Sequence, residues 1–253
     1  MTLDLTSGQP AYRQIADQLR AAILAGELQP SAKLTSERKL AEKYSVTQKT
    51  IREAVTLLRE EGLVESRQGL GTFVRQTPKR RLAHERFLRR HLEAGRAAFL
   101  AEVEAEGSRS KTETVVNREP SSATVASRLG LREGDPVLVR RRRYYRNGEP
   151  DKISASYLPL WIVQGTPIEE VNPGPGGIYA RLDELGYRLD HLVEEITTRM
   201  PRPDEARFLR LSRGVPVFAL VKIAIDVNGV AVELYDSVMP GDRYTLVYRV
   251  PVE

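Results

Sequence analysis

Residues 47–61, TQKTIREAVTLLREE, decide the fold of the N-terminal part, because they predict one amphipathic helix. Its apolar residues recur at helical spacing and would form a single buried face: Ile51, Ala54, Val55 and Leu58. Lys49, Arg52 and Thr56 project to the opposite side, and Gln48 lies at the margin. One face of the helix is therefore expected to pack in a core, while the other is cationic and able to form hydrogen bonds.

Two more helices and a hairpin flank this helix in the sequence. Residues 10–26 predict a first helix, and a second helix begins at Thr35 or Ser36, either of which can cap it. Residues 63–74 predict two short strands around a glycine-containing turn. Helix, short turn, helix and hairpin in this order are typical of a winged helix-turn-helix, whose last helix reads bases in the major groove. The alternative is a three-helix core whose charged face is only solvated.

Three motifs in this block carry a family resemblance. They are LTSER at 34–38, TIREA at 50–54 and GLGTFV at 69–74. The block resembles the GntR family of bacterial transcription regulators. The resemblance implies that Arg38 and Arg52 contact DNA and that the hairpin, the wing, enters the minor groove near Gly69 and Gly71.

We therefore expect one DNA-binding surface formed by the second helix, the N-terminal half of the third helix and the wing. Its predicted residues are Arg38, Thr47, Gln48, Lys49, Thr50, Arg52, Gln68, Gly69 and Gly71. The chain departs from the usual family pattern at Thr35, where the family usually has Pro, and at Gln48, where it usually has Arg. Gln pairs with adenine better than with guanine, so the operator base that meets Gln48 stays open.

The composition excludes several classes of protein. No run of about 18 apolar residues predicts a membrane span, and the first residues lack the pattern of a secretory signal. The absence of cysteine excludes disulfides and thiolate catalysis. None of the three histidines is spaced for a metal site. We expect a cytoplasmic protein without metal or cofactor, and its net charge of +5 permits a nucleic acid partner without establishing one.

The chain divides into three compositional blocks. Residues 1–76 form the predicted winged helix-turn-helix domain. Residues 77–107 are dense in arginine and predict a basic linker followed by a connecting helix. Residues 108–253 are richer in β-branched residues and carry two Asn-Gly dipeptides, which are strong hairpin signals. This last block is the predicted effector-binding and dimerisation domain.

The C-terminal block repeats itself. Matching residues, such as Val137 with Val217 and Pro159 with Pro240, are first 80 and then 81 positions apart, which suggests a one-residue insertion inside a strand. Each copy predicts a short helix, at 123–129 and at 204–211, followed by a hairpin. Two such αββ units packed about a pseudo-twofold axis would form one antiparallel sheet with helices against it, which is an α+β domain.

Several motifs of this block carry a second resemblance. They are GDPV at 134–137, NGEP at 147–150, SYLP at 156–159 and GDRY at 241–244. The block resembles the ligand-sensing UTRA domain of the HutC subfamily of GntR regulators, which shares the fold of chorismate lyase. The resemblance implies an effector site that uses Arg142, Tyr144 and Glu233. A second Arg is common where Tyr144 stands, and a Tyr where Met239 stands, so we expect a ligand that is less anionic and more apolar than a sugar phosphate.

Two further segments leave alternatives open. Residues 140–143 are four consecutive arginines, of which two would point to each side of a strand. They either lie on a solvated edge strand with ion pairs, or an inward pair requires an anion. Residues 172–177, NPGPGG, precede a predicted helix at 178–185 and either hold a phosphate at its N-terminus or form a flexible loop.

The function predicted from these patterns is a homodimeric DNA-binding regulator, a repressor, whose affinity for a pseudo-palindromic operator responds to a small-molecule effector. The alternative is an enzyme of chorismate-lyase type fused to a DNA-binding module. The sequence shows no nucleophile elbow, catalytic triad or carboxylate pair that would favour an enzyme. A pyridoxal-phosphate aminotransferase domain fails on length and pattern, and an all-helical sensor contradicts the predicted hairpins.

Overall fold

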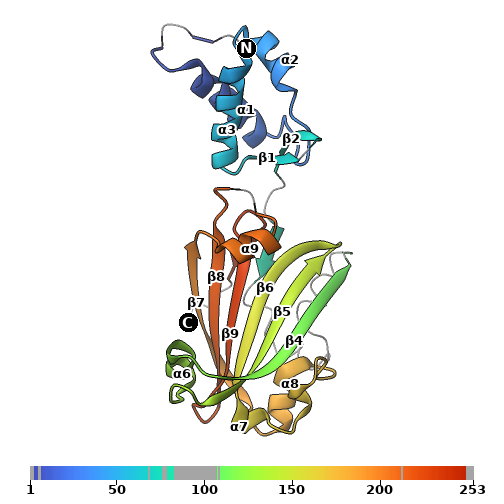
Figure 1. Cartoon of the computed structure of the whole chain (residues 1–253), viewed down its shortest axis with the longest axis vertical. Coiled ribbons are helices and arrows are strands. Elements are labelled where there is room, and N and C mark those ends of the chain that lie inside the picture. The colour runs from blue at the N-terminus through green and yellow to red at the C-terminus, as the bar shows by residue number, and fades with distance from the viewer. Residues whose placement is uncertain are drawn as a thin grey trace. The chain divides into compact units, whose positions relative to one another are not determined.

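The computed structural model describes residues 3–4, 7–67, 69–75, 79–82, 107, 109–211 and 213–248. The chain forms two compact units, which we describe separately (Figure 1). The N-terminal unit consists of residues 1–79 with the short segment 211–216, and the C-terminal unit of residues 80–210 and 217–253. Gln68 and the predicted connecting helix after residue 82 lie outside the described residues.

The N-terminal unit contains the predicted three helices and hairpin. They are α1 (Ala11–Leu24), α2 (Glu37–Tyr44), α3 (Gln48–Glu60), β1 (Val64–Arg67) and β2 (Gly71–Val74). Ser36 caps α2 by accepting a hydrogen bond from the Lys39 amide, and Thr47 caps α3 in the same way from the Thr50 amide. Ser45 ends α2 with a φ of 54°. The turn between α2 and α3 is therefore short, as the sequence predicts.

The core of this unit confirms the predicted apolar face of α3. Ile51, Ala54 and Leu58 are fully buried, and Val55 is nearly so. They pack with residues of α1, α2 and the wing: Ile15, Ala16, Leu19, Leu40, Ala41, Tyr44, Val64 and Val74. Burying the apolar stripe fixes the rotation of α3 about its axis, so the opposite face must point to solvent.

The C-terminal unit is built on one antiparallel six-stranded sheet in the order β4-β5-β6-β9-β8-β7. The strands are β4 (Ser110–Pro120), β5 (Pro136–Arg146), β6 (Glu149–Pro159), β7 (Leu189–Arg199), β8 (Val217–Asp226) and β9 (Ala231–Pro240). The helices are α6 (Ala123–Leu129), α7 (Leu160–Val163), the 3-10 helix η2 (Pro167–Glu169), α8 (Gly177–Glu184) and α9 (Pro203–Phe208). Two short strands, β3 (Lys79–Leu82) and β10 (Tyr244–Val247), pair separately.

The strand order confirms the internal duplication. β6 and β9 meet at the centre, where Ala155 pairs with Asp236, its own counterpart in the other copy. The repeat unit is one strand larger than predicted, because β4 and β7 occupy equivalent edges and precede α6 and α9. Each copy is therefore βαββ rather than αββ.

The predicted position of the inserted residue was wrong. The β5–β6 and β8–β9 pairs share the same register and the same bulge, at Asp151 and at Val232. The extra residue instead lies in the turn: two residues, Asn147 and Gly148, separate the paired Arg146 and Glu149, whereas three residues, 227–229, separate Asp226 and Val230, which also pair. Asn147 and Gly148 both have positive φ, as a two-residue hairpin turn requires.

The two faces of the sheet carry different side chains. Val137, Val139 and Leu234 pack under α6 on one face. Leu138 and Leu158 on the other face pack with α7, η2 and α8. Because side chains alternate along a strand, this second face also receives a group of polar residues, and we call it the polar face. Its polar residues are Arg140, Arg142, Tyr144, Lys152, Ser154, Ser156, Lys222, Glu233, Tyr235 and Ser237.

Candidate functional site

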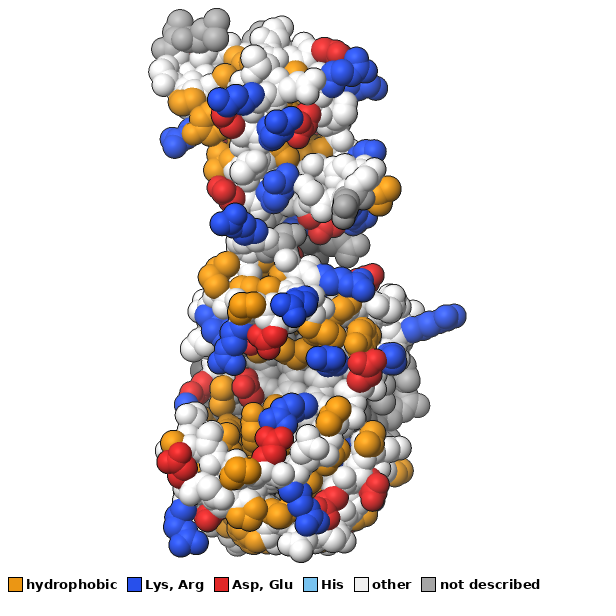
Figure 2. Space-filling view, in the orientation of Figure 1, with side chains coloured by type: hydrophobic (Ala, Val, Ile, Leu, Met, Phe, Trp, Pro, Cys, Tyr) orange, Lys and Arg blue, Asp and Glu red, His pale blue; other side chains and the backbone are white. Residues whose placement is uncertain are grey.

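The exposed side of α3 carries the polar residues expected for reading DNA. Gln48, Lys49 and Arg52 are exposed, while Ile51 and Leu58 on the other side have no exposed surface. Figure 2 shows that Lys and Arg side chains on the visible face of the N-terminal unit alternate with acidic ones and do not form one large cationic patch. Any DNA contact of this exposed side of α3 therefore has to come from a few individual cations, such as Lys49 and Arg52.

Arg52 is held in place by α2. Its Nη2 and Nε lie 3.2 and 3.3 Å from one carboxylate oxygen of Glu37. The Arg52 side chain is nevertheless 64 % exposed, so this ion pair contributes little to stability. Its effect is on orientation, because it fixes the guanidinium plane. Arg38 lies on the exposed side of α2, where it pairs with Glu42 at 3.2 Å.

Thr47 and Thr50 hold the start of α3. The Thr47 hydroxyl accepts from the Thr50 amide at 3.2 Å and lies 3.0 Å from the Thr50 hydroxyl. Their first role is therefore to fix the N-terminus of the helix. Sequence analysis identified both threonines but missed Glu37 as a partner of Arg52, because that contact joins two helices and only the fold brings it about.

The wing is a tight hairpin stabilised by a third segment of chain. β1 and β2 pair up to Arg67 opposite Gly71, and the Leu34 amide donates to the Thr72 carbonyl at 2.8 Å. Gly69 and Gly71 have φ of 71° and 114°, which only glycine adopts readily. A Cβ on Gly71 would also lie 3.0 Å from Cε of Lys33. Both glycines are thus explained by the backbone, whether or not DNA is bound.

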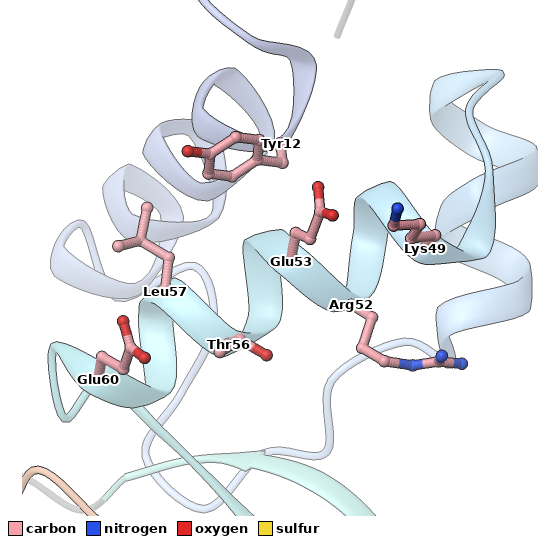
Figure 3. A pocket seen from close by; sticks show the side chains of 7 residues that line it. All are labelled: Tyr12, Lys49, Arg52, Glu53, Thr56, Leu57 and Glu60. Atoms are coloured by element: carbon pink, nitrogen blue, oxygen red, sulfur yellow. The ribbon is translucent and has the colours of Figure 1, made fainter.

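A groove runs beside α3 on the side of α1 (Figure 3). It is lined by Tyr12, Lys49, Arg52, Glu53, Thr56, Leu57 and Glu60. Lys49 and Arg52 lie at the N-terminal end of this stretch and Glu60 at the C-terminal end, as Figure 3 shows. Carboxylates repel phosphates, and Glu53 lines the groove as well as Glu60, so the part of α3 best suited to DNA is its start, at Gln48, Lys49 and Arg52.

The polar face of the sheet carries all three predicted effector residues. Arg142 donates to the Ser156 hydroxyl at 3.0 Å. Burial opposes the charged form of Arg142, but Tyr144, Glu233 and Tyr235 favour it and raise the pKa of its guanidinium. The guanidinium of Arg142 is therefore charged, and its charge interacts with both Tyr144 and Glu233.

A tyrosine of α8 completes this cluster. Burial raises the pKa of Tyr179 well above its usual value, and the Coulombic effect and hydrogen bond of Glu233 act in the same direction. Tyr179 is therefore a neutral phenol at physiological pH, next to a buried carboxylate. The cluster thus combines a cation, a carboxylate and hydroxyl groups, which is a set of groups able to hold a polar small molecule.

The four consecutive arginines divide between the two faces, and neither predicted alternative describes all of them. β5 is an interior strand, so the alternative of an edge strand does not hold. Arg141 pairs with Glu119, and Arg143 lies over the Phe208 ring at 5.0 Å. Arg140 is 1 % exposed, but its partners are backbone carbonyls rather than an anion. These carbonyls belong to Ile168, Glu170 and Val171.

The buried position of Arg140 also affects its ionisation. Burial, with the nearby charge of Arg142, lowers the pKa of Arg140 to about 10.

Sequence analysis missed two buried lysines on the polar face. Lys152 is 3 % exposed and lies 4.6 Å from the ring centre of Tyr144. Lys222 is 4 % exposed and lies 4.7 Å from the ring centre of Tyr235. The repeat contained a signal for one of them, because Lys222 is the counterpart of Arg142 at an offset of 80. Lys152 could be placed only from the strand register, which pairs it with Tyr144.

Two amides of the glycine-rich loop before α8 have partners within the loop. The Gly174 amide donates to the Asn172 side chain at 3.1 Å, and the Gly177 amide donates to the Gly174 carbonyl at 3.1 Å. These amides are occupied, so the geometry gives no support to a phosphate at this helix. Among the residues that the structure describes, no cluster of acidic or histidine side chains could hold a metal ion, and no helix could span a membrane.

Comparison with known proteins identifies both units. Residues 11–74 match the model for bacterial regulatory proteins of the gntR family, and residues 105–245 match the model for the UTRA domain. The chain belongs to the GntR family. It is 34 % identical to an uncharacterised HTH-type transcriptional regulator of Streptomyces coelicolor, over 94 % of this chain and 92 % of that protein. It is 28 % identical to the HTH-type transcriptional repressor NagR of Bacillus subtilis, over 98 % of both chains.

A solved structure agrees with this assignment. A crystal structure described as a GntR-family transcriptional regulator superposes with a TM-score of 0.66 at 30 % identity, over 97 % of this chain and 99 % of that one. This GntR-family protein is therefore a DNA-binding transcriptional regulator with a winged helix and a UTRA domain. Its relatives are regulators, which decides against the alternative of a chorismate-lyase-like enzyme.

Proposed function

We propose that the protein is a repressor that binds a pseudo-palindromic operator as a homodimer and responds to a small anionic effector. The observation that carries the DNA-binding part is the exposed Arg52, oriented by Glu37, on the side of α3 opposite its fully buried stripe. The name of the Bacillus subtilis relative, a repressor, supports the direction of regulation. Because bacterial operators lie in the cytoplasm, we place the protein there.

The proposed DNA contacts divide into two kinds. Arg52 and Gln48 read base edges in the major groove, where Arg matches guanine and Gln matches adenine. Lys49 and Arg38 bind phosphates and fix the position of the helix on the duplex. The remaining proposed contacts come from the helix cap and the wing: Thr47, Thr50, Gln68, Gly69 and Gly71.

The proposed dimer follows from the operator. Two recognition helices reach successive major grooves of one DNA face when their half-sites are about 34 Å apart. We assign DNA binding to residues 1–76, linkage to residues 77–107, and effector binding and dimerisation to residues 108–253. The arginine-rich linker is expected to add salt dependence if it meets phosphates.

The proposed effector site is the polar face around Arg142, Tyr144 and Glu233. Tyr144 stands where the family often has a second Arg, but Lys152 brings an ammonium group against its ring from the next strand. The cationic character missing at residue 144 is thus restored by its neighbour. We therefore propose a ligand with an anionic group, in place of the less anionic ligand that the sequence departures suggested. Glu233 would accept hydrogen bonds from hydroxyl or amino groups of this ligand.

Effector and operator must influence each other equally. If the effector weakens operator binding by some factor, the operator weakens effector binding by the same factor. The test begins with footprinting of the full-length protein on its own upstream DNA, followed by titrations of the protected fragment with and without phosphorylated and carboxylated small molecules. A ligand that binds with equal affinity in the presence and absence of operator would contradict the model.

A further inference from the structure

The tip of the wing carries an exposed leucine. Leu70 is 59 % exposed and lies between Gly69 and Gly71, whose φ values are both positive. Its amide donates to the Arg67 carbonyl at 3.0 Å, which closes the turn and fixes the backbone at the tip. The hairpin thus holds an aliphatic side chain at its extremity, where it contributes little to the core of the unit.

Two cationic residues stand next to this turn. The stem of Lys33 crosses the wing at Gly71, close enough that a Cβ there would meet Lys33 Cε at 3.0 Å. On the other strand, Arg67 lies over the Phe73 ring at 4.5 Å and donates from Nε to Glu65 at 3.0 Å. Arg67 pairs with Gly71 in the strand register, so the two cations lie on the same face of the hairpin, behind the apolar tip. An apolar tip with cations behind it suits a DNA groove, which has base edges on its floor and phosphates along its walls.

The minor groove floor distinguishes base pairs by one group. A·T pairs present only acceptors there, whereas a G·C pair adds the 2-amino donor of guanine. A leucine side chain has no acceptor for that donor and would remove it from water without a new hydrogen bond, which is unfavourable. The same side chain is accommodated more easily by an A·T floor, which lacks the protruding amino group.

We propose that Leu70 is a specificity-determining residue, which makes the wing reject G·C pairs at its minor-groove position. The proposal rests on the proposed function, in which the wing enters the minor groove. Leu70 would then discriminate between base pairs, whereas the rest of the wing is expected to contact only the DNA backbone. The discrimination depends on the guanine 2-amino group, so it can be tested by changing that group alone.

The experiment uses the full-length protein and an operator selected from a random DNA library. Four versions of the wing-facing base pair are compared by fluorescence anisotropy: A·T, G·C, inosine·C, which lacks the 2-amino group, and 2,6-diaminopurine·T, which gains it. The wild-type protein should bind A·T and inosine·C about fivefold to tenfold more tightly than the other two, a range usual for one mismatched pair. Leu70→Ala should reduce this ratio to below about twofold, because its smaller side chain leaves room for the amino group.

Two further variants complete the test. Leu70→Asn supplies a side-chain acceptor and should shift the preference toward G·C. Leu24→Ala removes another exposed leucine, 74 % exposed at the end of α1, and should leave all four affinities in their wild-type order. Equal binding of G·C and inosine·C by the wild type, or an unchanged ratio in Leu70→Ala, would overturn the role of Leu70 while operator binding stands. Failure of the wild type to select any sequence would overturn the proposed function and this inference together.

Discussion

The two units hold their cations in opposite environments. Arg38 and Arg52 lie exposed on α2 and α3, each beside a carboxylate of its own unit. Arg140, Lys152 and Lys222 are almost fully buried in the sheet unit. Exposed cations suit a polyanion such as DNA, whose binding releases counterions. Buried cations have lost their water already, so they suit a fixed set of protein acceptors or one discrete ligand. Charge alone therefore does not tell which partner a residue serves.

The largest expected effect on binding comes from an exposed cation of the N-terminal unit, Arg52. Arg52→Ala should strongly weaken specific operator binding, because a bidentate contact with guanine is worth about 1–3 kcal/mol and a dimer loses two of them. The operator affinity should fall by roughly 30-fold or more, measured by anisotropy on the footprinted fragment. Arg132→Ala, which removes an equally charged exposed side chain from the other unit, is the control. If Arg52→Ala keeps operator affinity within threefold, α3 does not read the bases as proposed.

The next effect concerns a buried carboxylate in the sheet unit. Burial alone would raise the pKa of Glu205, but the Arg199 guanidinium and the Arg202 amide lower it below its usual value. The ionised form is thus favoured in the folded state, and its stabilisation is present above about pH 4.5 and lost as the pH falls through the lowered folded pKa. Glu205→Gln should cost about 2–4 kcal/mol at pH 7 and flatten the acid limb of stability.

The measurement is urea unfolding of the wild type and the variant between pH 3 and pH 7. Glu195→Gln, which removes an exposed partner of Arg128, is the matched control and should change the free energy of unfolding far less, because water screens an exposed ion pair. An acid limb identical in Glu205→Gln and wild type would show that this buried pair does not set the acid stability.

A third prediction tests whether the cations of the polar face serve a ligand. Arg142→Ala should keep operator affinity within about twofold and remove the response to the effector, since one charge-assisted contact is worth about 1.5–3 kcal/mol. The response is the ligand-dependent shift in melting temperature and in operator affinity, screened with phosphorylated and carboxylated compounds. Arg141→Ala, on the opposite face of the same strand, should keep that response. Loss of operator affinity in Arg142→Ala at saturating protein would remove Arg142 from the ligand site.

The smallest effect concerns the orientation of Arg52. Glu37→Gln weakens the ion pair that holds the guanidinium and should reduce specific binding by about threefold, in keeping with an exposed pair worth 1 kcal/mol or less. Non-specific binding should strengthen slightly, because a negative charge leaves the DNA side. Glu42→Gln, which frees Arg38 instead, should strengthen both kinds of binding. A specificity ratio that rises in Glu37→Gln would show that Glu37 does not position Arg52.

Local patterns predicted the winged helix well. The apolar stripe and the caps at Ser36 and Thr47 follow from neighbouring residues, so the sequence could place α2 and α3 closely. The sheet was harder, because β4 and β7 are edge strands with mixed polar and apolar residues and lack a clean alternation. The partners of Arg140 could not be predicted, because the carbonyls that satisfy it lie about 30 residues away in an irregular segment. Pairings of this kind depend on the tertiary fold alone.

The duplicated sheet has also lost its symmetry in charge. Lys152 and Glu233 occupy equivalent places in the two copies, and both are buried on the polar face. Two identical repeats would carry the same group at both places, and a bound molecule would then have no preferred orientation between them. With a lysine in one half and a glutamate in the other, the two halves of the face differ, so a polar ligand with unlike ends would be bound in one orientation.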